Sequence, residues 1–94
     1  MAEKAIGGFM QVDRVIREIV ETSGKTFTGV SRELGHSPHW CGNVAASGRS
    51  PALATVADVA DVAGMRLDVV DVETGETVGS IEPPRRSAAD AGRA

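Results

Sequence analysis

The feature that most constrains the fold is Gly35, which divides residues 26–50 into two short segments of helical character. A helix ends just before this glycine, and Ser37 with Pro38 restarts the chain as a new helix that runs to about Ser47. A serine can cap a helix N-terminus, and proline suits the first helical position because its missing N–H would be unpaired there. The sequence therefore predicts a tight helix–turn–helix with a small, polar second helix.

Helical spacing predicts two further helices on either side of this unit. Residues 10–23 carry apolar side chains on one face and charged ones on the other, and Gly24 ends the segment. Residues 52–63 follow a second Ser-Pro pair and stop at Gly64. The side chains expected to face inward are Val12, Val15, Ile16, Ile19 and Val20 in the first helix, and Leu53, Val56, Ala57, Ala60 and Ala63 in the last.

Beyond residue 65 the apolar period changes from helical to two, which indicates a β-hairpin over residues 66–82. The sequence 73–76 supplies its turn, and Val69-Val70 interrupts the alternation, as a bulge would. We therefore expect a mostly α fold with a C-terminal β-hairpin: a flexible N-terminus at 1–9, a helix-turn-helix domain at 10–65, the hairpin, and a disordered tail at 83–94.

Composition limits the alternatives. The 94 residues suit one domain, and only three are aromatic, so aliphatic side chains must build the core. The single cysteine, Cys41, cannot form an internal disulfide, which fits a reducing cytoplasm, and no apolar run is long enough for a membrane span.

The charges are divided unevenly along a chain whose net charge is −3. Residues 24–50 carry three basic side chains against one acidic, whereas residues 51–82 carry seven acidic side chains against one basic. A small positive face with an acidic body behind it is suited to orienting a protein on DNA.

This arrangement resembles the Cro and phage-repressor class of helix-turn-helix regulators, the XRE family, over residues 10–65. The likeness rests on the turn at Gly35, the buried Leu34 before it, the apolar pair Cys41 and Val44, and Ser31 where the family usually has alanine. It implies a four-helix, lambda-repressor-like domain in a sequence-specific transcriptional regulator, a dimeric repressor that reads a palindromic operator and uses no cofactor.

Two sets of residues are candidates for contact with double-stranded DNA. Small side chains and an amide on the third helix can approach base edges, and Asn43 can pair bidentately with adenine. The candidate base contacts are Ser37, Pro38, His39, Gly42, Asn43 and Ala46; the candidate phosphate contacts are Lys25, Thr26, Thr28, Trp40, Ser47, Arg49 and Ser50. The alternatives are a merely solvent-facing helix, hydroxyls that only cap helices, and a Trp40 that packs locally.

The hairpin is the candidate dimer interface, through Val69, Val70, Val72, Val78 and Ile81. A two-stranded hairpin alone is marginal in water, so it must pack on its own helices or on a second copy. A second function remains open: an antitoxin or other interaction module that binds a partner protein through residues 66–94.

Metal binding and catalysis find little support in the sequence. His36, His39 and Cys41 could suggest a metal site, but helical geometry should point Cys41 inward and His39 outward, and a closed zinc site needs four ligands. No nucleophile, paired carboxylate or phosphate-binding glycine loop is evident. We therefore expect neither a metal nor an enzyme.

Overall fold

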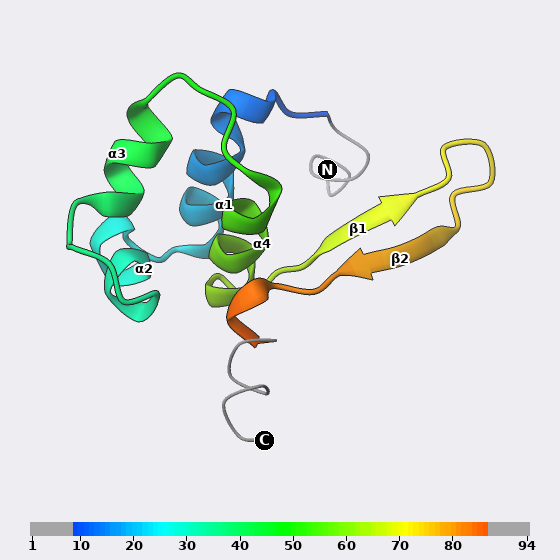
Figure 1. Cartoon of the computed structure of the whole chain (residues 1–94). Coiled ribbons are helices and arrows are strands. Elements are labelled where there is room, and N and C mark those ends of the chain that lie inside the picture. Colours follow the sequence, from blue (N-terminus) through cyan, green and yellow to red (C-terminus); the bar gives the residue numbers. More distant parts are fainter. Residues whose placement is uncertain (1–8, 87–94) are drawn as a thin grey trace.

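In the computed structural model, which describes residues 9–86, a helical body is followed by a two-stranded hairpin (Figure 1). This confirms the expected mostly α fold with a C-terminal β-hairpin. The elements in chain order are the 3-10 turn η2 (Val12–Arg14), α1 (Val15–Ser23), α2 (Phe27–Glu33), α3 (Trp40–Ala46), α4 (Leu53–Val62), β1 (Leu67–Val70) and β2 (Thr77–Ile81).

The core of the helical body (residues 12–65) is aliphatic, as the scarcity of aromatic residues requires. Val20, Val30 and Val59 are almost completely buried, and each comes from a different helix. Cys41 and Ile16 join the same cluster, so all four α-helices contribute to it. Burial of this surface provides the main driving force for folding of the body.

Two helices end in the same hydrogen-bonded motif, each at a glycine. At the end of α2 the N–H of Gly35 donates to Arg32 and the N–H of His36 donates to Ser31. Gly64 ends α4 with the equivalent pair of bonds, and both glycines have a φ near 80° that L side chains rarely adopt. The expected turn at Gly35 and the stop at Gly64 are thereby confirmed.

The prediction that the two Ser-Pro pairs start helices is wrong. The N-cap of α3 is His39 and that of α4 is Ala52, and neither cap side chain accepts a hydrogen bond from its helix. Pro38 and Pro51 thus each lie one residue before the N-cap. There the fixed φ of proline restricts the backbone of the loop that leads into the helix.

The expected inward face of α4 is also partly wrong. Leu53, in the first turn, is 60% exposed, whereas Val59 and Val62 are buried. In the first predicted helix, Val12 was also expected to face inward. It is 63% exposed, because it lies in η2, before α1 begins. Since α4 is apolar on most of its circumference, apolar spacing alone could not select the buried face.

The hairpin extends away from the helical body rather than folding back over it (Figure 1). Its strands are antiparallel, Leu67 pairs with Ile81, and the register shifts between Val69 and Val70, at the expected bulge. The turn is closed by Asp71, whose carboxylate accepts from the N–H of Glu73. Leu67 alone of these strand residues packs against the core cluster.

Residues 83–86 form a short connection to α4 where the sequence suggested the start of a disordered tail. Residues 84–86 are helical, the N–H of Arg85 donates to Asp58, and the guanidinium groups of Arg85 and Arg86 both bind Asp61. Asp58 and Asp61 of α4 are therefore both engaged by the segment that follows the hairpin. The rest of the expected tail, 87–94, and the N-terminal segment 1–8 lie outside the described residues.

Asp61 is the centre of this connection, and its side chain is only 12% exposed. Burial alone would raise the pKa of this carboxyl, but hydrogen bonds from Arg85 and Arg86, together with their charges, lower the pKa below its ordinary value. The ionised form of Asp61 thus holds the end of the hairpin to the helical body.

Candidate nucleic-acid interface

The joint between α2 and α3 is fixed by a buried hydroxyl. Ser31 is completely buried, and its Oγ donates to the carbonyl of Phe27 in α2 and accepts from the backbone N–H of Cys41 in α3, each at 2.8 Å. The Cys41 N–H is one of the donors that the first turn of a helix leaves without an intrahelical partner. Ser31 therefore caps α3 from the neighbouring helix and fixes the orientation of the two.

This joint leaves one side of α3 and its preceding loop in solvent. Cys41 and Ala45 are buried and Val44 is half-buried, so the opposite side faces outward. Five of the six predicted base-contact residues share that exposure, and we call them the recognition face: Ser37, Pro38, His39, Asn43 and Ala46.

Gly42, the sixth, lies differently. It is half-buried, and a Cβ added to it would meet the Cβ of Phe27 at 3.8 Å, an ordinary contact distance. Gly42 thus lies at the edge of the contact between α3 and α2. Because it has no side chain, only its backbone atoms could take part in a contact beside the recognition face.

Trp40 packs locally. Its ring stacks on that of His36 with the centroids 3.9 Å apart and the planes at 13°, and the half-buried indole also packs against the core cluster. The local packing considered for Trp40 is therefore present, and its proposed phosphate contact remains a prediction.

The predicted phosphate contacts other than Trp40 fall into two exposed groups. Lys25, Thr26 and Thr28 lie at the start of α2; the Thr26 hydroxyl accepts from the Gly29 N–H at 2.9 Å, so Thr26 is the cap of that helix. The second group, Ser47, Arg49 and Ser50, follows α3. The capping role of Thr26 does not decide whether it also meets a phosphate.

Charge is distributed around the recognition face in a way that favours an anion. Residues 34–48 contain no lysine, arginine, aspartate or glutamate; Arg32, Glu33 and Arg49 flank that range, and Lys25 lies farther back at the start of α2. The carboxylates that dominate the chain belong instead to α4 and the hairpin, where Asp61 and Asp68 bind arginines. No carboxylate therefore comes from α3 itself.

The cysteine and histidines of this region do not converge. Cys41 is fully buried whereas His39 is exposed, and burial raises the pKa of the Cys41 thiol. Within residues 9–86 no three histidine, cysteine or carboxylate side chains come together as metal ligands would. A buried thiol with a raised pKa serves here as a small core residue.

Sequence reasoning missed two features of this region and its support. Ser31 was considered only for its place in the helix-turn-helix pattern, although a polar residue at a buried position is itself a signal of a hydrogen bond. The contacts of Arg85 and Arg86 with α4 join residues about 25 apart, and no local pattern announces them.

Among residues 9–86, no helix is long and apolar enough to cross a membrane. Comparison with known proteins assigns no family to the chain. No protein-family model, no curated protein and no solved structure matches this chain.

Proposed function

We propose that this protein is a sequence-specific DNA-binding transcriptional regulator of the cytoplasm, a dimeric repressor that reads a palindromic operator through α3. The observation that carries the proposal is the exposed, uncharged recognition face, held by the Ser31 hydroxyl against a second helix. A face of small side chains allows close approach to another surface, whereas a helix exposed only to water has no need of them.

Major-groove geometry suits this face. The groove of B-DNA admits an α-helix, and an asparagine can make two hydrogen bonds to adenine. Asn43, exposed in the middle of α3, is the residue assigned to this pairing, and the adjacent Ala46 offers a methyl group to thymine. His39 can donate to guanine or to a phosphate.

Affinity would come from the cationic and hydroxyl groups on both flanks. Arg49 is the principal phosphate contact, with Lys25 on the other flank. With so few cations, one subunit would bind DNA weakly, so two subunits are needed for a useful affinity. A symmetric dimer would place two α3 helices roughly 34 Å apart, one DNA turn, and select a palindrome.

Selection from a random-sequence DNA library tests this proposal. The expected result is enrichment of a palindrome with half-sites one helical turn apart. On that site, Asn43→Ala should cost about 1–3 kcal/mol and relax specificity at one base pair, whereas Arg49→Ala should weaken binding to all sequences alike.

Arg14→Ala is the matched control, because Arg14 lies in η2 and faces Glu18 of α1. It should leave affinity unchanged. Equal binding of selected and scrambled DNA by the wild-type chain would contradict the proposal, and unchanged specificity of the Asn43 variant would remove Asn43 from base reading.

An antitoxin or other protein-binding module is the second candidate. It is favoured by the exposed valines of the hairpin and by the acidic turn, which suit a basic protein partner. Copurification of a small basic protein that is lost on substitution of Val72 and Val78 by aspartate would support it.

A further inference from the structure

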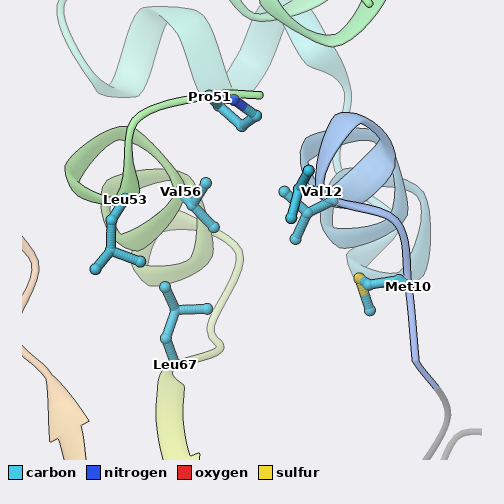
Figure 2. A pocket seen from close by; sticks show the side chains of 7 residues that line it. Met10, Val12, Pro51, Leu53, Val56 and Leu67 are labelled. Atoms are coloured by element: carbon cyan, nitrogen blue, oxygen red, sulfur yellow. The ribbon is translucent and has the colours of Figure 1, made fainter. Parts of the chain in front are cut away.

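The helical body carries an apolar groove that involves none of the recognition face. Figure 2 shows it between η2 and α4, lined by side chains that include Val12 and Leu53. Every side chain that lines the groove is apolar, and nothing among residues 9–86 shows what covers it. The ring stack of His36 on Trp40, in contrast, brackets three residues of the recognition face and bears directly on the proposed site.

A β-turn at residues 37–40 presents those three residues. The N–H of Trp40 donates to the carbonyl of Ser37 at 3.1 Å, which closes the turn. His39, at the third position, has a φ of −95° and a ψ of −1°, close to the values of a type I turn. Most residues tolerate this conformation, so the turn can present the exposed side chains of Ser37, Pro38 and His39 without selecting them.

The two rings join the residues on either side of the exposed positions. His36 precedes the turn and Trp40 closes it, and their rings lie nearly parallel, with centroids 3.9 Å apart and planes at 13°. Both residues are themselves anchored. The N–H of His36 donates to the backbone carbonyl of Ser31 at 2.9 Å, and the indole of Trp40 packs against the core cluster. The stack therefore connects the turn to the end of α2 and to the core.

The turn has little other support. His39 is the N-cap residue of α3, but its side chain accepts no hydrogen bond from that helix. The single hydrogen bond that closes the turn contributes little net stability, because water bonds to the same groups when the turn is open. A stacked pair of rings stabilises a contact beyond the area that it buries. The conformation of the turn thus depends on the stack.

We infer that His36 is a positioning residue for DNA recognition: stacked on Trp40, it holds the turn in the conformation in which Ser37, Pro38 and His39 meet the bases. This inference rests on the proposed function and divides its site into two parts. Asn43 lies within α3, where the helix backbone holds it. Base pairs read from the turn should therefore depend on His36, and the base pair read by Asn43 should not.

Amide hydrogen exchange tests the stack in the absence of DNA. His36→Ala should raise the exchange rate of the Trp40 N–H about two- to tenfold, the range expected for the loss of one pair of stacked rings. His36→Phe, which retains a ring, should restore the slow exchange. His39→Ala is the matched control, because it removes an imidazole three residues away that is outside the stack; it should leave the rate unchanged.

Base preferences on the DNA site selected by the wild-type chain test the consequence. His36→Ala should weaken the preference about two- to tenfold at the base pairs where His39→Ala also weakens it, since a smaller fraction of turns has the binding conformation. The preference that is lost in Asn43→Ala should remain. His36→Phe should restore the wild-type pattern, because the ring and not its nitrogen atoms supports the turn.

The outcomes separate this role from the proposed function. Unchanged Trp40 exchange in His36→Ala overturns the stack as the support of the turn, whether or not the chain binds DNA. A uniform loss at all base pairs, that of Asn43 included, or failure of His36→Phe to restore the pattern, overturns the positioning role. A wild-type chain that selects no DNA sequence contradicts the proposed function and this role together, even where exchange responds as expected. If His36→Ala fails to fold, as circular dichroism would show, His36→Gln replaces it.

Discussion

The helical body and the hairpin place the same amino acid in opposite environments. Val20, Val30 and Val59 are almost completely buried in the body, whereas Val72 and Val78 of the hairpin are almost fully exposed. The body buries most of its aliphatic side chains, with Val12 and Leu53 as exceptions, whereas four valines of the hairpin are exposed. Among residues 9–86, the core valines of the body are thus covered by neighbouring helices and the hairpin valines are not.

Among the tests of this contrast, truncation of a core valine should change the free energy of unfolding most. Val59→Ala should lower the free energy of unfolding by about 2–3 kcal/mol, because it removes buried methyl groups and leaves a cavity. Val72→Ala, the matched change in the hairpin, should stay within about 0.5 kcal/mol for the monomeric chain. Urea unfolding at low protein concentration measures both, and equal losses would contradict the contrast.

A smaller loss is expected at the joint between α2 and α3. Ser31→Ala would leave the N–H of Cys41 buried without its acceptor, at a cost of about 1.5 kcal/mol. Ser50→Ala, at an exposed position, is the control and should be near neutral. Thermal unfolding followed by circular dichroism compares the two, and a Ser31 variant as stable as the control would show that the hydroxyl contributes nothing net.

The smallest effect concerns Asp61, which links α4 to the residues that follow β2. Asp61→Asn should cost about 1 kcal/mol near neutral pH, since it weakens the contacts with Arg85 and Arg86. Because folding lowers the pKa of Asp61, its contribution is fully present above the unfolded-state pKa and is lost as the pH falls through the lower folded-state pKa.

Measuring stability as a function of pH tests whether the charge of Asp61 is responsible. The stability difference between wild type and Asp61→Asn should shrink as the pH is lowered below about 4. Asp13→Asn, at an exposed position in η2, should show no comparable difference at any pH. A difference that persists unchanged in acid would mean that Asp61 acts through packing rather than charge.

Local patterns were sufficient to predict several parts of the fold. Gly35 and Gly64 end helices because their backbone conformation favours glycine, and the change to a period of two beyond residue 65 predicted the hairpin with its bulge. Helical periodicity within α3 also accounts for the exposure of Asn43 and Ala46 opposite the buried Cys41 and Ala45.

What local patterns could not supply were contacts between distant residues. Ser37 was a reasonable cap for α3, but Ser31 caps that helix from ten residues away in the chain, so no cap is needed beside it. The arginines that follow β2 gave no sign of binding Asp61 on α4. Leu53 was misplaced because α4 offers more apolar surface than the body buries.

The Ser31 hydroxyl has a further consequence for which residues near α3 can vary. Because α3 is anchored through Cys41 to α2, the side chains of Ser37, Pro38 and His39 are not required to hold it in position. Those three residues can be exchanged as a cassette while the scaffold keeps its geometry. The loop that precedes α3 is thus freer to vary in sequence than the joint that supports the helix.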